Sequence, residues 1–458
     1  MKISLLPPLL LPSTVTKLAR ETGWLARKQR ICSPSVFVEA LVSSVSCGYR
    51  SFREIATEIG LLTGKTLSKQ ALSERFNERG VEFLKKVVAG ALREAIQPQA
   101  DSALRNLPRI VRILVGDSST IALNRSLASV FPGATNQSGI DSAQLKFQLT
   151  LDLLTGRWLQ TDLNSYKKPD QSASRDVLAA TLKPGDLIIR DLGYTVVETF
   201  GEIAAVGAFY LSRHLQGTAL FDPSSKQRLG LYKLASERAA LPGKTFSMEV
   251  LMGAGSMLPC RLVFIRVPQE IADGRRRKLK EKAKRKGRSA PTKIHLALQD
   301  WSFYVTNLDK TQAGNTQLYE LYQLRWRVEN IFKIAKSQTG LLKIAGHRTN
   351  RHHVEMLIWA WVLLMISMSK LGIFRLVEIA SGSPSPEVVE ASIFKGIDRI
   401  LQWIAPAIEL AAAGSFEALM ERLRQQQRYH DCYEKRSRVS MPQLVERALK
   451  LDSTFVLP

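Results

Sequence analysis

The pattern of apolar and polar residues is helical in the first part of the chain. Residues 14 to about 105 predict a run of helices. Within them, residues 51–80 predict a helix, a turn containing glycine and a second helix. This order fits a helix-turn-helix that binds DNA, and it fits an ordinary helical bundle equally well. In the first case, four side chains would be available to DNA: Lys69, Gln70, Ser73 and Arg75.

From about residue 108 the pattern changes to that of strands. Residues 109–117 (RIVRILVGD) form a short apolar run that ends in Asp117, as expected of a buried strand. Residues 145–153 (LKFQLTLDL) alternate strictly between apolar and polar positions, which predicts a strand with one apolar face. A turn then leads into residues 157–163 (RWLQTDL), so these two strands should form a hairpin.

The next two segments predict a helix and a further buried strand. Residues 172–182 have a helical pattern, and residues 186–191 (DLIIRD) are an apolar run that ends in Asp191. The order is therefore strand, two hairpin strands, helix, strand. A helical crossover that returns beside the first strand gives a mixed sheet.

Several more strands are expected between residues 208 and 308, followed by helices after residue 310. Within the strand-rich part, residues 275–288 (RRRKLKEKAKRKGR) hold ten Lys or Arg in fourteen positions. We expect a solvated, partly disordered loop here, with phosphate binding as a candidate role.

The apolar run at 356–368 is 13 residues long, which suits a buried helix better than a membrane span. The last segment, about 376–458, should be helical and amphipathic.

Charge narrows the class of partner. The 458 residues carry 65 Lys and Arg against 41 Asp and Glu, a formal charge of +24. Such a protein usually binds a polyanion, because neutralising phosphates releases counterions; a basic surface that only confers solubility is the alternative.

The four cysteines lie far apart, which argues against a zinc site or a disulfide framework and indicates a reducing cytosol. The apolar N-terminus has three prolines and no cleavage site, so we expect an arm, not a signal peptide.

Two carboxylates suggest a metal site. Asp117 and Asp191 each follow an apolar strand, where a charged side chain is costly without a partner. Either residue alone fits a helix cap or a turn. Both together, at the ends of neighbouring strands, can converge at the carboxyl edge of the sheet. Close carboxylates repel unless a cation lies between them, and Mg²⁺ prefers such oxygen ligands.

A third acid lies within a basic helical segment, residues 322–336 (YQLRWRVENIFKIAK). On a helical wheel Tyr322, Arg325, Glu329 and Lys336 share one strip beside the apolar face. Glu329 is thus placed to be a third metal ligand, with Arg325, Lys336 and Tyr322 holding phosphates. The alternative is an ion pair between Glu329 and Arg325 or Lys333.

The spacing Tyr322-x2-Arg325-x3-Glu329-x6-Lys336 resembles the signature of bacterial insertion-sequence transposases of the fourth insertion-sequence family, a branch of the DDE transposases. The segments GDSST and RDLGY resemble that family's two Asp motifs. The resemblance covers roughly residues 108–370, and the basic run at 275–288 is not part of the signature.

The resemblance implies an α/β fold: a ribonuclease H-like mixed sheet with a β-rich insertion, flanked by helical N- and C-terminal domains. The expected organisation has five segments. They are a helical DNA-binding domain (1–105), the first part of the core (106–205), the β-rich insertion (206–308), the second part of the core with the catalytic helix (309–375), and a helical region for dimerisation (376–458).

The resemblance also implies a chemistry. Asp117, Asp191 and Glu329 would bind two divalent ions, Mg²⁺ or Mn²⁺ in its place. Water would free a 3′-hydroxyl at the end of the insertion sequence, and this hydroxyl would attack target DNA. Some members pass through a DNA hairpin with a tryptophan stacked on a flipped base. Trp301 is the candidate here, and a core position in a strand is its alternative. Arg213 is a further candidate for DNA contact, and His214 a weaker one.

The partners implied are double-stranded DNA, as terminal inverted repeats and as target, and a second copy of the chain in the synaptic complex. No membrane is involved, and the expected location is the bacterial cytoplasm, in association with the nucleoid. Two other functions stay open: a metal-dependent nuclease that cannot join strands, and a DNA-binding relic without catalysis. The complete set of acids counts against the relic, and the Tyr-Arg-Lys set around Glu329 is not needed by a plain nuclease.

Overall fold

The computed structural model divides into two compact units. It describes residues 10–26, 31–46, 51–93, 107, 109–135, 139, 141–153, 158–168, 181–326, 328–329, 332–333, 341 and 348–370. Unit 1 holds the described residues up to 93, those of 117–168 and those of 328–370. Unit 2 holds those of 107–116 and 181–326. The predicted helix at 172–182, except Thr181 and Leu182, and the C-terminal segment at 376–458 lie outside the described residues.

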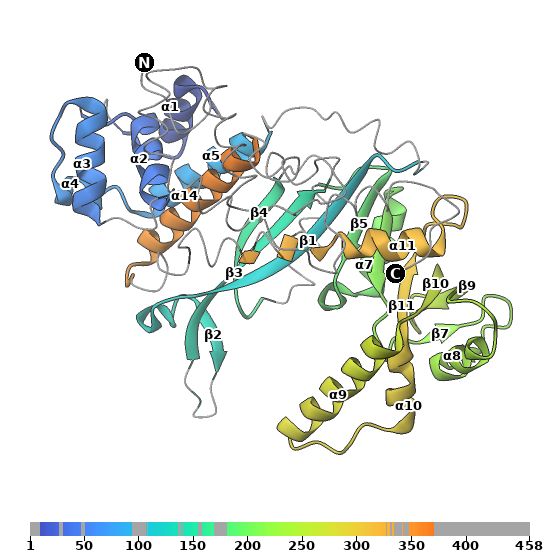
Figure 1. Ribbon diagram of the computed structural model, residues 1–458. Coiled ribbons are helices and arrows are strands. Elements are labelled where there is room, and N and C mark those ends of the chain that lie inside the picture. Colours follow the sequence, from blue (N-terminus) through green and yellow to red (C-terminus); the bar gives the residue numbers. More distant parts are fainter. Residues whose placement is uncertain are drawn as a thin grey trace, which may run out of the picture. The chain divides into compact units, whose positions relative to one another are not determined.

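Unit 1 begins with the helices that the sequence predicts (Figure 1). They are α1 (Pro12–Glu21), α2 (Pro34–Ser46), α3 (Phe52–Thr63), α4 (Lys69–Ser73) and α5 (Glu78–Arg93). Their core is aromatic: the ring of Trp24 stacks on Phe83 at 4.7 Å and tilts against Phe37 at 4.8 Å. Such ring pairs add to the stabilisation that burial itself provides.

The predicted helix-turn-helix corresponds to α3 and α4. Ser51 and Glu54 form a capping box at the start of α3, and Gly64 ends it in the left-handed conformation, with φ of 69°. The second helix, α4, has only five residues. Lys69 and Gln70 are exposed on it, Ser73 is half-buried, and Arg75 donates to the carbonyl of Ala71. DNA binding by this pair of helices stays a prediction.

The apolar run at 356–368 is part of α14 (Arg351–Lys370), which is buried from Met356 to Ile366. It lies beside α5 and α2 (Figure 1). Among the described helices, none has the length and the apolar character needed to cross a membrane. The prediction of a buried helix is confirmed.

The strands of unit 1 are the second half of β1 (Arg112–Ala122), β2 (Pro132–Thr135), β3 (Asp141–Asp152) and β4 (Trp158–Ser165). Strands β3 and β4 form the predicted antiparallel hairpin, in which Phe147 pairs with Leu163. Phe147 and Trp158 pack against Trp361 of α14, at 5.6 and 6.2 Å between ring centroids. The apolar face of β3 is therefore the core face of this unit. Its polar face, however, is also buried: Lys146 reaches the carbonyl of Lys168 at 2.7 Å.

Unit 2 is built on a mixed sheet in the order β1-β5-β6-β11-β10-β9-β7-β8, to which β1 contributes its first half. Its further strands are β5 (Asp186–Arg190), β6 (Phe209–Arg213), β7 (Leu220–Phe221), β8 (Arg228–Leu229), β9 (Thr245–Met252), β10 (Leu258–Arg266) and β11 (Trp301–Thr306). The pairs β1/β5 and β5/β6 are parallel. The pairs β6/β11, β11/β10, β10/β9, β9/β7 and β7/β8 are antiparallel.

The first strands of this sheet are fastened by a buried ion pair. Asp186 at the start of β5 is fully buried and accepts two hydrogen bonds from the guanidinium of Arg112, at 2.8 and 2.5 Å. The backbone N–H of Lys183 donates to the same carboxylate at 2.7 Å. The two bonds from Arg112 tie the start of β1 to the start of β5, where these two residues are register partners.

The helices of unit 2 are α7 (Val197–Ala205), α8 (Leu231–Ala239), α9 (Gln269–Arg285), α10 (Lys293–Ala297) and α11 (Asn315–Gln323). Three short 3₁₀ helices complete the described elements: η1 (Arg125–Leu127) in unit 1, and η2 (Leu192–Tyr194) and η3 (Leu298–Asp300) in unit 2. In unit 1, β1 neighbours β3, which pairs with β4; in unit 2, β1 pairs with β5 and β5 with β6. This is the strand order of a ribonuclease H-like core, and the predicted fold class is confirmed.

Two local predictions were wrong. The basic run at 275–288 is helical over most of its length, since α9 extends to Arg285. The segment 322–336 does not continue as a single helix, because α11 ends at Gln323. There Leu324 and Arg325 donate to carbonyls three residues earlier, which tightens the last turn.

Candidate active site

Asp191 follows a completely buried strand of the sheet. All five residues of β5 are buried, and Asp191 directly follows as the N-cap of η2. Its side chain makes no capping hydrogen bond, and the residue is half-exposed. The carboxylate is therefore not used to end the strand or to begin the 3₁₀ helix, and it remains available to a ligand at the carboxyl edge of the parallel strands.

Tyr322 holds that carboxylate. It lies in the last turn of α11, is 8% exposed, and donates from its hydroxyl to Oδ1 of Asp191 at 3.3 Å. Burial raises the pKa of Tyr322; Asp191 raises it further, and Arg325 and Arg213 oppose this effect. The phenol is thus protonated and acts as a donor. The sequence predicted a phosphate as the acceptor, whereas the hydrogen bond observed goes to Asp191.

Two cations lie around this pair. Arg325 follows α11 in a turn, with its guanidinium 5.8 Å from the centre of the Tyr322 ring. Arg213 is the last residue of β6 and lies opposite Tyr304 of β11 in the register of the sheet. Both are half-exposed and close enough to lower the pKa of Tyr322. Their predicted contacts with DNA, to phosphates in the case of Arg325, are compatible with this exposure and stay a prediction.

The sequence did not point to the residues that surround Tyr322. Tyr304 packs its ring against Tyr322 at 5.0 Å and against Tyr319 at 6.2 Å, and burial raises its pKa to about 12. Arg275 of α9 lies beside Tyr304 and Tyr319, and burial lowers its pKa. The alternation of WSFYVTNL would have placed Tyr304 on the same face as Ser302 and Thr306, but it carries no sign of a tyrosine cluster.

The other two candidate acids belong to unit 1. Asp117 lies within β1, not at its end, and its Oδ1 accepts from the backbone N–H of Ser118 at 2.8 Å. Burial along β1 nevertheless breaks off after Gly116 and returns only at Ile121, so the expected change from a buried to a half-exposed environment does occur at Asp117. Glu329 is helical and half-exposed. Lys336 lies outside the described residues.

Three carboxylates form a donor set suited to hard divalent ions such as Mg²⁺. The open carboxylate of Asp191 fits this use, since its side chain caps no helix. In the part of the chain that the structure describes, no three His, Cys, Asp or Glu side chains are grouped closely enough to hold a metal ion. The three-carboxylate metal site therefore stays a proposal.

Trp301 is placed in the core of unit 2. It is the first residue of β11, is 5% exposed, and packs its ring against Phe246 and Phe264 at 6.1 and 6.3 Å. The guanidinium of Arg266 lies 6.0 Å from its centre. This packing favours the core alternative over base stacking.

His214 is also buried, and burial lowers its pKa to about 4, so at neutral pH it offers no charge to DNA.

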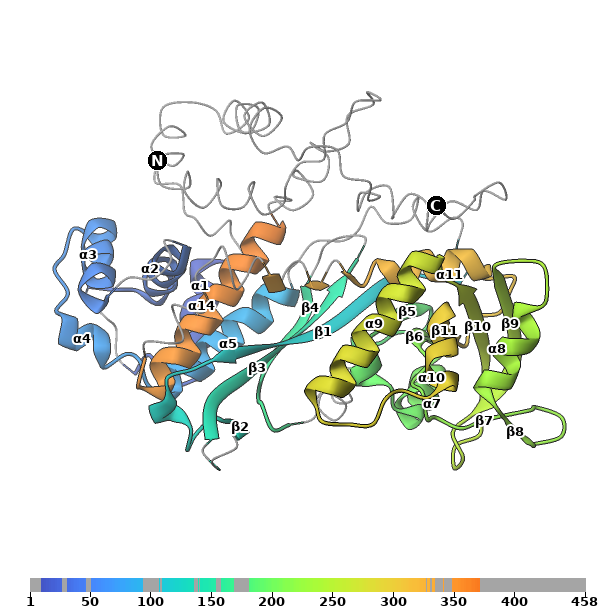
Figure 2. The ribbon, with the colours of Figure 1, turned by 60° about the horizontal axis from the view of Figure 1, so that its bottom comes forward.

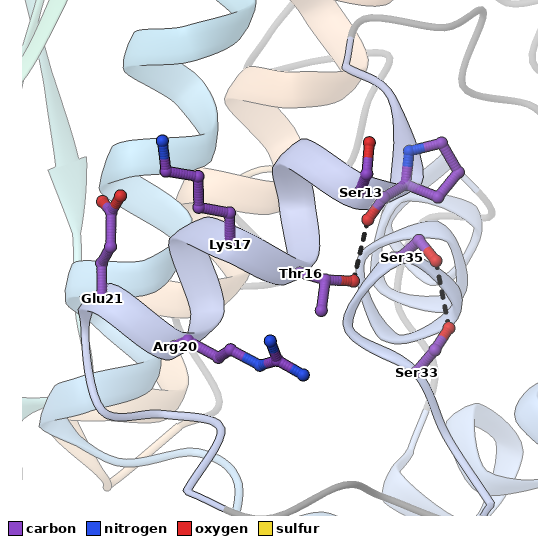
Figure 3. A pocket seen from close by; sticks show the side chains of 8 residues that line it. Ser13, Thr16, Lys17, Arg20, Glu21, Ser33 and Ser35 are labelled. Carbon is purple, nitrogen blue, oxygen red and sulfur yellow. Dashed lines mark hydrogen bonds between the residues drawn. The ribbon is translucent and has the colours of Figure 1, made fainter.

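A separate pocket of about 620 Å³ lies in unit 1, between α1 and the start of α2 (Figure 3). Lys17, Arg20 and Glu21 line it from α1, and Ser33 and Ser35 from the other side. Glu21 also pairs with Lys86 at 3.4 Å. None of the candidate acids lines this pocket, so it is not the predicted active site.

Comparison with known proteins gives a consistent answer. The family model described as "Transposase DDE domain" matches residues 111–365. The transposase for insertion sequence element IS231F of Bacillus thuringiensis subsp. israelensis is 30% identical over 340 residues, which cover 71% of this chain and 70% of that protein. The transposase for IS1151 of Clostridium perfringens is 27% identical over 347 residues, 70% of each chain.

Among solved structures, the cryo-EM structure of the piggyBac transposase synaptic complex with hairpin DNA aligns with a TM-score of 0.43 and 9% identity. The alignment covers 94% of this chain and 84% of that one. The family model covers more than half of the chain, and its range contains Asp117, Asp191 and Glu329. The chain therefore belongs to the DDE transposase family and is a transposase of the bacterial insertion-sequence type.

Proposed function

We propose that this transposase cleaves the ends of its own insertion sequence and joins the freed 3′-hydroxyls to target DNA. Asp117, Asp191 and Glu329 are the proposed catalytic residues and metal ligands. The observation that carries the proposal is the half-exposed carboxylate of Asp191 at the exit of β5, which accepts a hydrogen bond from the buried Tyr322 at 3.3 Å and caps no helix.

The register of the parallel strands supports the pairing of the two aspartates. Val115 of β1 pairs with Ile189 of β5. Asp117 follows Val115 by two residues, and Asp191 follows Ile189 by two residues. Parallel strands reach the same edge of a sheet together, so equal offsets bring equivalent side chains to that edge.

The proposed reaction has two displacements at phosphorus. In the first, a water oxygen attacks at the transposon end, the bond from phosphorus to O3′ breaks, and a 3′-hydroxyl is released. In the second, this hydroxyl attacks a target phosphate, and the target's own bond to O3′ breaks. Two bound Mg²⁺ ions, or Mn²⁺ in their place, would activate the attacking oxygen and stabilise the leaving one.

The protein's own residues have distinct parts in this proposal. The three acids supply the oxygen ligands, and Tyr322 fixes the orientation of Asp191. Arg325, Lys336 and Arg213 would hold backbone phosphates, where Arg offers two parallel donors to phosphate oxygens. The hairpin route with Trp301 would need this side chain to leave its packing against Phe246 and Phe264, so we do not include it in the proposal.

The proposal is tested by incubating the purified protein with Mg²⁺, a labelled duplex bearing the end of the element, and a supercoiled plasmid as target. We expect strand cleavage at the end followed by joining of that end to the plasmid. A duplex with a scrambled end sequence is the control. Cleavage without joining would favour a metal-dependent nuclease, and binding without either step would favour a DNA-binding relic.

A second copy of the chain is part of the proposal, because two ends must be processed together. The C-terminal segment 376–458, which lies outside the described residues, is the candidate for the dimer contact. Truncation after about residue 385 should weaken the pairing of two ends more than the binding of one. Equal pairing by the truncated and full chains, measured by gel shift with two labelled ends, would place the contact elsewhere. The proposed location is the cytoplasm, with the nucleoid.

A further inference from the structure

Helix α9 is fastened to unit 2 at its beginning. Arg275 donates to the carbonyl of Trp301 at 3.2 Å and to Oγ of Ser302 at 3.0 Å. Arg276 forms ion pairs with Asp273 and Asp300 and donates to the carbonyl of Leu296 at 3.2 Å. These bonds tie the helix to β11 and to α10, so its first half has a fixed direction within the unit (Figure 1, Figure 2).

The rest of α9 is a dense row of exposed cations. Between residues 277 and 288 the single acid is Glu281. None of the cations in this stretch forms an ion pair with another described residue, and all are exposed. They are Arg277, Lys278, Lys280, Lys282, Lys284, Arg285, Lys286 and Arg288.

Their arrangement follows from the helical period. The buried Ala272 and the half-exposed Leu279 and Ala283 fall within one narrow sector of the wheel, and the cations of 277–285 are spread over its flanks and the opposite side. At about 1.5 Å per residue, the stretch 277–288 presents roughly one positive charge every 2 Å. Duplex DNA carries about one negative charge per 1.7 Å of its axis, so the two charge densities are comparable.

The helix ends in a defined way. Gly287 adopts the left-handed conformation with φ of 60°, its N–H donates to the carbonyl of Lys284, and the N–H of Arg288 donates to the carbonyl of Ala283. This is a Schellman motif, which satisfies the last carbonyls and stops the helix. The cationic row is therefore an ordered element, not a tail.

We propose that the exposed cations of α9 bind the sugar-phosphate backbone of target DNA. The stretch 277–288 has no Asn, Gln, Ser or Thr, and five of its eight cations are lysines, which act as point charges towards phosphates. Such a surface holds a duplex without regard to sequence. Target DNA differs from one event to the next, whereas the ends of the element do not. This inference rests on the proposed function, because only strand joining requires a target.

The test removes four charges from α9 and compares this variant with a matched control in the same unit. The α9 variant carries Lys278→Gln, Lys280→Gln, Lys282→Gln and Lys284→Gln, since Gln keeps helix propensity and length. The control removes four exposed cations elsewhere in unit 2 by substitution with Gln: Arg228, Lys233, Lys244 and Lys310. Matching circular dichroism spectra and melting temperatures establish that both variants fold.

Binding is measured by fluorescence anisotropy with a short duplex of random sequence over a range of KCl concentrations. For the α9 variant we expect the slope of log affinity against log salt to fall by about 2 to 4, at roughly 0.9 for each phosphate that the protein no longer neutralises. Affinity near physiological salt should drop about tenfold or more. The slope of the control should fall by about 1 at most. Equal slopes for the α9 variant and the parent would overturn the proposal.

A second readout separates target DNA from the element's end. With a pre-cleaved end that already carries its 3′-hydroxyl, the α9 variant should join to plasmid about tenfold more slowly than the control. Its cleavage of an intact end should stay within about twofold of the parent. Equal loss of cleavage and joining would assign α9 to the end and overturn the target assignment. If the parent itself neither cleaves nor joins, the proposed function fails, and the salt slope still decides whether α9 binds DNA.

Discussion

The substitution Tyr322→Phe isolates the contact that positions Asp191. It removes one hydroxyl from a side chain that is 8% exposed and leaves the ring against Tyr304 at 5.0 Å. The hydrogen bond removed, at 3.3 Å to Oδ1 of Asp191, is longer than an optimal O–H···O bond, which lies at about 2.5–3.0 Å. A hydrogen bond to a charged acceptor contributes about 1.5–3 kcal/mol at good geometry, so we take about 1–1.5 kcal/mol here.

This energy sets the size of the expected effect. If Tyr322 acts by orienting Asp191, removal of the hydrogen bond raises the free energy of the transition state by this amount. About 1.4 kcal/mol corresponds to a tenfold change in rate. We therefore expect cleavage of an end duplex to slow by roughly 5- to 15-fold. The Mg²⁺ concentration for half-maximal rate should rise, because a less oriented carboxylate is a poorer ligand. The melting temperature should change little, since the Phe ring fills the same space.

The assay is single-turnover cleavage of a labelled end duplex across a Mg²⁺ titration, with Tyr319→Phe as the matched control. Tyr319 lies on the same helix and also packs against Tyr304, but the described hydrogen bond to Asp191 comes from Tyr322. A rate within twofold of the parent for Tyr322→Phe would refute the positioning role. So would an equal loss in Tyr319→Phe, or a loss matched by a lower melting temperature.

Three further predictions concern stability. Burial lowers the pKa of His214 from 6.5 to about 4, so unfolded chains take up its proton first as pH falls. The contribution of neutral His214 to the free energy of unfolding should be fully present above about pH 6.5 and decline towards pH 4, with a loss of about 2 kcal/mol at pH 5. His214→Gln should make this decline less steep when the free energy is measured by urea unfolding at several pH values. Asp186→Ala breaks the buried pair with Arg112 and should cost about 3 kcal/mol, seen as a lower urea midpoint; an unchanged midpoint would show the pair to be dispensable. Trp301→Ala should cost about 3–5 kcal/mol, as for a core residue, whereas a lost hairpin product at unchanged stability would restore the base-stacking alternative.

Much of the fold follows from local pattern. The run DLIIRD predicted both the buried strand β5 and the polar residue at its exit, because a fully buried parallel strand leaves little choice of residue type. The alternation in LKFQLTLDL predicted β3 and its core face. The polar face of β3 was not predicted to be buried. Lys146 reaches a backbone carbonyl from the loop after β4, and a period of two carries no information about that partner.

The two wrong predictions share the lack of a local signal in the sequence. Helix α9 has an apolar stripe too narrow to stand out among ten basic residues, and Arg275 and Arg276 hold it to distant backbone groups. The end of α11 at Gln323 has no proline or glycine beside it. The helical wheel that placed the four signature residues on one strip assumed one continuous helix over 322–336. The hydrogen bond from Tyr322 to Asp191 joins residues 131 positions apart in the sequence, so no local pattern could predict it.

The central claim is that Asp117, Asp191 and Glu329 bind the metal ions for cleavage while the cations bind DNA. The most direct test measures end binding and Mg²⁺-dependent cleavage side by side for Asp117→Asn, Asp191→Asn and Glu329→Gln. Each variant keeps the size of the side chain and removes its charge. We predict end affinity within about twofold of the parent, or higher where repulsion from phosphate is relieved, and cleavage reduced at least about 100-fold. Near-parental cleavage by any one of the three would remove that residue from the site, and near-parental cleavage by Glu329→Gln would leave it only an ion-pair partner.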